Sequence, residues 1–130
     1  EDVLNDQLDS IEKKYETLIF MKDLVKECTN LLSSKTYDPK IFGGLLHSAW
    51  LAKKSLANSI SNTRIDSYYN IALSNGAYGG KIAGAGGGGF LMLICDPNKK
   101  EHLKNLLTPL RHVPISYEPR GSEIGYLASE

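Results

Sequence analysis

The chain has 130 residues, of which 42% are hydrophobic, and its 15 lysines and arginines balance 15 aspartates and glutamates. This length suits a single domain with a real core, and the balanced charge argues against a general nucleic-acid-binding protein, which is usually basic. No apolar run approaches the roughly 20 residues that a membrane span needs. The acidic, polar first ten residues do not resemble a signal peptide.

The two cysteines, Cys28 and Cys95, have neither a CxxC spacing nor a neighbouring histidine, so a zinc site is not expected. A disulfide between them is one interpretation, and two reduced thiols in a cytoplasmic protein are the interpretation we favour. The chain begins inside a helical pattern and without methionine. We therefore expect residues 1–130 to form one domain that is a piece of a longer protein.

The first third of the chain predicts one long helix, from about residue 3 to residue 33. Its apolar side chains recur at alternating steps of four and three, which is the spacing of one helix face. This stripe begins with Leu4, Leu8, Ile11, Tyr15 and Leu18. The apolar phase drifts after Leu18, so a helix packed on its own domain is favoured over a coiled-coil partner surface.

Two further helices are predicted from their capping residues. Asp38 followed by Pro39 is typical of a helix start, because the carboxylate caps free backbone N–H groups and proline suits the first helical position. Gly43 and Gly44 lie inside this second helix, where they cost stability and indicate either close packing or a bend. Asn62 or the threonine after it caps the third helix.

The pattern then changes to short apolar segments. "KIAG" and "FLMLIC" flank a glycine run, and the second is a continuous apolar segment typical of a buried strand. Asp96 starts a fourth helix, the alternating "HVPISYEP" predicts a strand, and "EIGYLAS" predicts a last one. The order of three helices followed by β-loop-β-α-β-β predicts an α+β fold, with helices packed on a mostly antiparallel sheet.

The glycine run "KIAGAGGGGF" formally satisfies the G-x-G-x-x-G pattern from Gly84 to Gly89. A dinucleotide-binding unit is not expected, because the run leads into a strand rather than a helix and lacks the later acidic residue. A Walker A loop needs Lys-Ser or Lys-Thr where this chain has Phe90-Leu91. The protein-kinase fold is excluded by the length and by the lack of "HRD" and "DFG".

What remains is a glycine loop between two strands, and the backbone conformations open to glycine favour the binding of an anion. Glycines permit positive φ, so that successive N–H groups converge into a nest that binds phosphate. The missing side chains also let a ligand approach the backbone closely. The alternative is a sharp corner where another backbone crosses. A simple hairpin turn needs at most two glycines, and five glycines in the six positions 84–89 exceed that need.

These residues resemble a known family. "GGKIAGAGGGGF" is similar to the third conserved motif of the GHMP kinases, the galactokinase, homoserine, mevalonate and phosphomevalonate kinase superfamily. That resemblance implies a ferredoxin-like α+β C-terminal domain of a two-domain kinase, whose N-terminal nucleotide-binding domain is absent from this chain. Ala83 departs from the motif, because many members carry serine or threonine there, and any hydroxyl contact at that position is absent.

Flanking residues resemble the sugar-kinase branch that phosphorylates heptose 7-phosphate. The matching positions are Trp50, Lys53, Lys54 and Leu56, then Ile60, Ser61, Asn62, Ile65 and Asp66, with "VPISYEPRGSEI" near the end. The resemblance implies an ATP-dependent kinase that acts on the anomeric hydroxyl and yields a 1,7-bisphosphate. Alternatives are a GHMP kinase for a fucose-like sugar or a mevalonate-pathway intermediate, and a non-catalytic ferredoxin-like module that binds a phosphorylated ligand.

The resemblance also implies a set of substrate- and phosphate-binding residues. The loop positions are Gly84, Ala85, Gly86, Gly87, Gly88 and Gly89. Lys53, Lys54 and Arg64 are candidates for holding phosphate, although a solvated helix face explains any one of them as simply. Ser61 and Asn62 are candidates for binding sugar or phosphate, and helix capping explains them equally well.

No catalytic residue and no metal ligand are expected in this chain. The resemblance assigns ATP and Mg²⁺ mainly to the missing N-terminal domain, together with the catalytic acidic residue. The expected partners are ATP and a sugar phosphate, with no nucleic acid and no membrane, and the oligomeric state stays open. By itself the 130-residue chain is expected to be inactive as a kinase.

Overall fold

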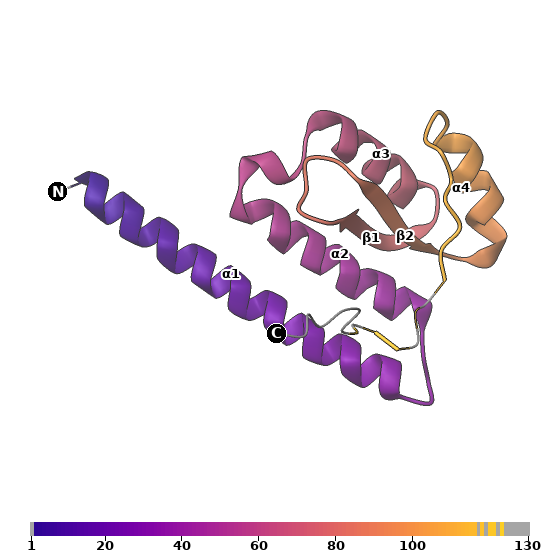
Figure 1. Cartoon of the computed structure of the whole chain (residues 1–130), viewed down its shortest axis with the longest axis horizontal. Coiled ribbons are helices and arrows are strands. Elements are labelled where there is room, and N and C mark those ends of the chain that lie inside the picture. The colour runs from indigo at the N-terminus through magenta and orange to yellow at the C-terminus, as the bar shows by residue number, and fades with distance from the viewer. Residues whose placement is uncertain (1, 117, 119, 122, 124–130) are drawn as a thin grey trace, which may run out of the picture.

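A computed structural model of the chain describes residues 2–116, 118, 120, 121 and 123, with side chains from residue 10 onward. Within these residues, four α-helices pack with a two-stranded antiparallel sheet, which confirms the α+β class (Figure 1). The elements are α1 (Asp2–Ser33), α2 (Pro39–Leu56), η1 (Asn58–Ile60), α3 (Thr63–Ser74), β1 (Ala77–Ala83), β2 (Phe90–Cys95), η2 (Pro97–Lys99) and α4 (Lys100–Leu106).

The predicted caps form at the starts of α2 and α3. A carboxylate oxygen of Asp38 accepts a hydrogen bond of 2.7 Å from the N–H of Lys40, and Pro39 occupies the first helical position. Asn62 caps α3 through its side-chain oxygen, which accepts from the N–H of Ile65 at 3.0 Å. Both helix starts are therefore determined by local side-chain chemistry, which explains why the sequence predicted them.

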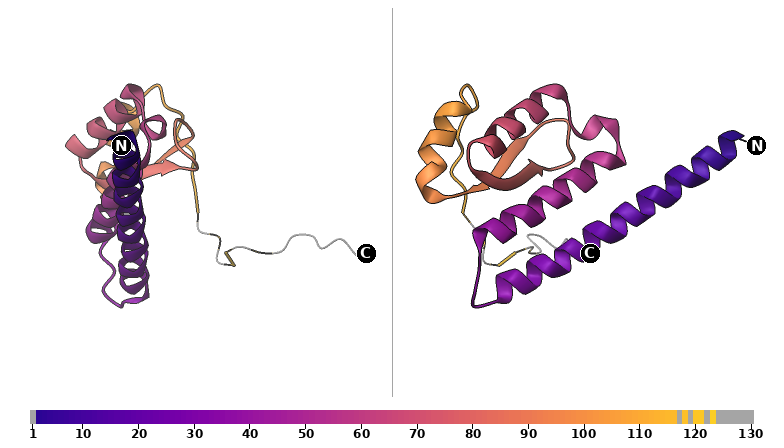
Figure 2. Two further views of the ribbon diagram at one scale, coloured as in Figure 1. Left: turned by 90° about the vertical axis from the view of Figure 1, so that its left-hand side faces the viewer. Right: turned by 180° about the vertical axis from the view of Figure 1, so that it is seen from behind.

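The core lies between the helices and the hairpin of β1 and β2. Trp50 of α2, Tyr69 of α3 and Ile82 of β1 are at most 3% exposed and form one buried cluster. A second cluster joins α3, β1 and α4 through Ala72, Ala77, Leu103 and Leu107. The helices gather on one side of the hairpin (Figure 2, left), so both clusters hold the hairpin against α2 and α3.

The seam between α2 and β1 is closely packed. A Cβ atom on Gly79 would lie 1.9 Å from the carbonyl oxygen of Gly43, and one on Gly43 would lie 2.6 Å from the Cβ of Tyr78. Such distances leave no room for a side chain on either glycine. Gly44, by contrast, has no atom within 4 Å of a Cβ position. Close packing therefore explains Gly43, and the helix runs on through both glycines.

The long helix α1 packs on its domain along only part of its length. Leu24 is 6% exposed, whereas Ile11, Tyr15 and Leu18 are 64%, 64% and 53% exposed. The prediction of a helix packed on its own domain is thus wrong for the described N-terminal part. At 1.5 Å per residue, α1 is about 48 Å long and α2 is about 27 Å long, so α2 cannot cover the whole helix. Figure 1 shows the N-terminal part of α1 projecting past α2.

The strand predicted over "HVPISYEP" does not form in the described residues. Residues 111–116 have no regular secondary structure, and Val113 and Ile115 are 42% and 77% exposed. Pro114 provides no backbone N–H for a sheet ladder, and apolar alternation does not by itself create a partner strand. The strand predicted over "EIGYLAS" lies outside the described residues apart from Glu123.

The hairpin of β1 and β2 positions the glycine loop. Ala83 faces Phe90 at the end of the ladder, and Ala77 faces Cys95 at the other end, with a bulge between Ala77 and Gly79. The connection is therefore the six residues 84–89, which form the closed end of the hairpin. This loop lies beside the segment that joins α2 to α3 (Figure 1).

Two further expectations bear on the chemistry of the chain. Cys28 and Cys95 are both free thiols and partly buried, so they form no disulfide with each other.

The helices in the described part of the chain include none with the length and apolar character needed to cross a bilayer.

Candidate functional site

The glycine loop adopts a backbone that side chains rarely allow. Gly84, Gly86, Gly87 and Gly89 have φ angles of +96°, +121°, +74° and +111°. L-residues with a Cβ atom avoid this half of conformational space. Gly88 is different, because its φ is not positive and no atom lies within 4 Å of a Cβ position there. Glycine at position 88 is therefore not required by the fold as described.

The loop rests on the connection between α2 and α3. The N–H of Gly87 donates to the carbonyl oxygen of Ile60 at 2.8 Å, and the side-chain amide of Asn62 donates to the carbonyl of Gly87 at 3.4 Å. A Cβ on Gly86 would lie 2.8 Å from the carbonyl oxygen of Ile60. A crossing backbone thus explains glycine at position 86, whereas positions 84 and 88 have open space.

Several N–H groups of the loop face no acceptor. Within the described residues, the N–H groups of Ala85, Gly86 and Gly88 have no hydrogen-bond partner, and Ala85 and Gly88 are exposed. Successive N–H groups on backbone that alternates between right- and left-handed conformations form anion-binding nests, and Gly84, Gly86, Gly87 and Gly89 supply the left-handed positions in this loop. The loop therefore offers donors and space, and no side chain of its own, to an anionic group.

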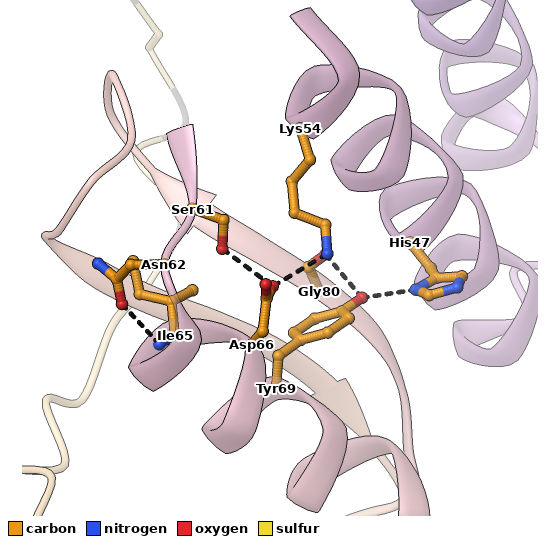
Figure 3. Close-up of polar contacts among 8 residues, drawn as sticks. All are labelled: His47, Lys54, Ser61, Asn62, Ile65, Asp66, Tyr69 and Gly80. Carbon is orange, nitrogen blue, oxygen red and sulfur yellow. Dashed lines mark hydrogen bonds and ion pairs between the residues drawn. The ribbon is translucent and has the colours of Figure 1, made fainter. Parts of the chain in front are cut away.

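Lys54 and Ser61 converge on Asp66, a residue that the sequence analysis had not assigned to the site (Figure 3). The Lys54 ammonium forms an ion pair with Asp66 Oδ1 at 3.0 Å, and the Ser61 hydroxyl donates to the same oxygen at 2.9 Å. The hydrogen bond from Lys54 holds the pKa of Asp66 below its usual value, and Ser61 adds to this effect against partial desolvation. Lys54 also lies 5.8 Å from the centre of the Trp50 ring.

Lys53 and Arg64 have different surroundings from Lys54. The Lys53 ammonium donates a hydrogen bond to the carbonyl oxygen of Gly84, at the start of the loop. The Arg64 guanidinium lies 5.9 Å from the centre of the Tyr68 ring, on the exposed side of α3. Of the three predicted cations, Lys53 is therefore the one that the structure brings into contact with the glycine loop.

Comparison with known proteins agrees with this geometry. Residues 29–109 match the family described as GHMP kinases C terminal, and this match covers the glycine loop and the helices around it. The chain belongs to the C-terminal domain family of GHMP kinases. The sequence is also similar to D-glycero-alpha-D-manno-heptose 7-phosphate kinase of Campylobacter jejuni, with 42% identity over 59 residues. That alignment covers 45% of this chain and 17% of the relative.

Two hydrogen-bonding contacts of the Tyr69 hydroxyl support strand β1 of this GHMP domain. The Tyr69 hydroxyl donates to the carbonyl oxygen of Gly80 at 3.2 Å and lies 2.8 Å from Nδ1 of His47 (Figure 3). A phenol has one proton, so a hydroxyl that donates to Gly80 requires His47 Nδ1 to be the other donor. Burial raises the pKa of Tyr69 to about 12. The sequence alone did not indicate this contact.

Metal-binding side chains are sparse around this loop. Between residues 10 and 116, no three histidine, cysteine, aspartate or glutamate side chains gather closely enough to hold a metal ion. Asp66, the carboxylate nearest to the predicted site residues, is already paired with Lys54.

Proposed function

We propose that this chain is the acceptor-side domain of an ATP-dependent sugar kinase whose acceptor is a heptose 7-phosphate. In this proposal the domain works with a separate nucleotide-binding domain that binds ATP and Mg²⁺. The observation that carries the proposal is the glycine loop, which has free N–H groups on Ala85, Gly86 and Gly88 and open space around Gly84 and Gly88. Membership of the GHMP kinase family supports phosphoryl transfer, and the name of the Campylobacter relative supports the choice of acceptor.

The proposed reaction transfers the γ-phosphoryl group to the anomeric hydroxyl. A bond forms between the hydroxyl oxygen and phosphorus, the bond to the β-phosphate oxygen breaks, and ADP leaves. In this proposal the proton of the hydroxyl passes to a base on the separate nucleotide-binding domain. The loop would contribute by positioning: its N–H groups hold phosphate oxygens without moving during the reaction.

The proposed acceptor is tested with the protein expressed from its complete reading frame. ADP release is measured with ATP, Mg²⁺ and a panel of D-glycero-D-manno-heptose 7-phosphate, fucose, galactose and mevalonate. We expect turnover with the heptose 7-phosphate, and loss of turnover when alkaline phosphatase has first removed the 7-phosphate. A preference for another acceptor would overturn the heptose assignment.

A matched variant tests whether the glycine loop is part of the reaction. Gly88→Val adds a side chain where the fold leaves open space, so the variant is expected to fold and to lose most of its turnover. Gly44→Ala in α2 is the control, because its Cβ position is also open and lies in a helix. Full activity of Gly88→Val would contradict a role for the loop. Absence of turnover with every acceptor would favour a non-catalytic binding module.

A further inference from the structure

The two adjacent lysines at the end of α2 have different contacts. Successive residues of an α-helix point about 100° apart, since a turn holds 3.6 residues. Lys54 points toward α3, where it pairs with Asp66, whereas Lys53 reaches the glycine loop 31 positions further along the chain. The side chain of Lys54 is therefore occupied by an ion pair between helices, and Lys53 is the cation that contacts the loop.

The contact made by Lys53 matters because the loop has almost no side chains with which to hold itself. Ordering glycine costs more backbone entropy than ordering any other residue. Three hydrogen bonds with residues outside the loop compensate for this cost. Lys53 donates to the carbonyl oxygen of Gly84, and the side chain of Asn62 donates to the carbonyl oxygen of Gly87. The N–H of Gly87 donates to the carbonyl oxygen of Ile60. Lys53 therefore holds the first residue of the loop, whereas Ile60 and Asn62 hold Gly87 in its second half.

The direction of these contacts is also informative. Lys53 and Asn62 both donate to carbonyl oxygens of the loop, at Gly84 and Gly87. Carbonyl oxygens would repel a phosphate, whereas free N–H groups attract it. A donor on each carbonyl fixes the peptide planes, and fixed planes keep the N–H groups of the intervening residues available. An ammonium also cancels the partial negative charge of the carbonyl it contacts.

We infer that Lys53 is a positioning residue that holds the glycine loop open for phosphate by binding the carbonyl of Gly84. The inference rests on the proposed function, since it names the residue that shapes the same phosphate site. It gives Lys53 a different role from the one expected from the sequence, where Lys53 was a candidate for holding phosphate directly. Lys53 acts on the loop before any ligand arrives, and Lys54 acts on the packing of α2 against α3.

The test uses the isotope-labelled 130-residue chain and its variants Lys53→Met, Lys53→Arg and Lys54→Met. Amide hydrogen exchange is measured at Gly87 without ligand, because that N–H donates to Ile60. Binding of inorganic pyrophosphate is then measured by calorimetry. We expect Lys53→Met to speed exchange at Gly87 and to weaken pyrophosphate binding, each by roughly tenfold, the size expected for a hydrogen bond to a charged group.

The variants distinguish positioning from direct binding and from simple destabilisation. Lys53→Arg keeps a donor and is expected to stay within about threefold of the wild type in both measurements. Lys54→Met is expected to lower the unfolding midpoint and to leave pyrophosphate affinity nearly unchanged. Normal exchange in ligand-free Lys53→Met with weakened binding would mean that Lys53 contacts phosphate directly, which overturns the inference.

The proposed function and the inference fail in different ways. If the wild-type chain binds no pyrophosphate, the loop of this chain is not a phosphate site, and the exchange measurement still reports whether Lys53 positions it. If the wild type binds and Lys53→Met matches it in both exchange and affinity, the inference is wrong and the proposed phosphate site stands.

Discussion

Glycines in two neighbouring regions of the molecule meet opposite physical needs. In the seam between α2 and β1, Gly43 and Gly79 are required because the two backbones leave no space for a Cβ atom. In the loop at residues 84–89, Gly84 and Gly88 have open space around them. Gly84 is required there by its φ of +96°, and Gly88 is required by nothing in the described fold.

Because of this difference, we expect substitutions in the two regions to affect different quantities, namely stability in the seam and ligand binding in the loop. Substitution in the seam forces backbones apart and acts on the free energy of unfolding. Substitution at Gly88, which has open space and no positive φ, adds atoms only where a ligand would lie, and acts on affinity. The two regions share the same strand, since β1 carries the seam at Gly79 and leads into the loop at Gly84. Glycine content by itself therefore does not identify a binding site, but the surroundings of each glycine do.

The largest effect is expected in the seam. Gly79→Ala places a Cβ atom 1.9 Å from the carbonyl oxygen of Gly43, a contact that only movement of the backbone can relieve. We expect a loss of at least about 3 kcal/mol in the free energy of unfolding, at the upper end of overpacking effects. Urea denaturation followed by circular dichroism measures it. A loss below about 1 kcal/mol would show that the seam is not closely packed.

The open loop position is expected to show the reverse behaviour. Gly88→Val should bind inorganic pyrophosphate at least about tenfold more weakly, which corresponds to about 1.4 kcal/mol, because its side chain fills the space above the free N–H groups. Its unfolding midpoint should match that of the wild type, since nothing lies within 4 Å of the added Cβ. Calorimetric titration and urea denaturation of one preparation provide both values. Unchanged affinity would remove the contrast between the two regions.

Tyr69 is expected to make the seam sensitive to alkaline pH. Burial raises the pKa of Tyr69 to about 12, whereas a tyrosine in the unfolded chain ionises near pH 10. The native state thus holds this proton more tightly, so its contribution to stability is complete below about pH 10 and is lost as the pH rises toward 12. Tyr69→Phe should flatten this dependence and cost about 1 kcal/mol at neutral pH, because the hydrogen bond to Gly80 is lost.

Urea denaturation at a series of pH values tests the role of Tyr69, with Tyr68→Phe as the matched control on the same helix. Tyr68 is only partly buried, so its variant should keep the alkaline loss of stability. If the pH dependence of stability became equally flat in both variants, the loss of stability at alkaline pH would belong to a group other than Tyr69.

The smallest expected effect is a gain in stability at Gly44. The position is helical, its Cβ site is open, and glycine in a helix interior costs about 0.5–1 kcal/mol relative to alanine. Gly44→Ala should therefore raise the free energy of unfolding by that amount, measured by thermal denaturation. A loss of stability would mean that the helix needs flexibility at this point, which is the bend that the structure does not show.

The fold was predictable where local chemistry determines it. The starts of α2 and α3 follow from Asp38 and Asn62, which cap their own helices within three residues. The strand expected around Val113 was wrong, because pairing depends on a partner elsewhere in the chain and alternation alone does not supply one. The apolar periodicity of α1 likewise could not show how much of the helix packs on the domain, because that length is determined by the shorter helix α2.

The site was predictable in part for the same reason. The density of glycine between two apolar segments predicted a loop with positive φ angles, which the structure has, and anion binding by this loop stays a prediction. The separate contacts of Lys53 and Lys54 were not predictable, because each lysine meets a partner that only the tertiary fold brings close. Asp66 offered a weak signal, since an acid in the first turn of α3 lies near residues that precede the helix.

The most direct test of the central claim is a nuclear magnetic resonance titration of the labelled 130-residue chain with D-glycero-D-manno-heptose 7-phosphate, following the backbone amides of residues 84–89. We expect saturating shifts at Ala85, Gly86 and Gly88, where the N–H groups are free, and no shift at Gly44. Saturating shifts confined to another surface, or a folded chain whose loop amides stay unchanged into the millimolar range, would contradict it.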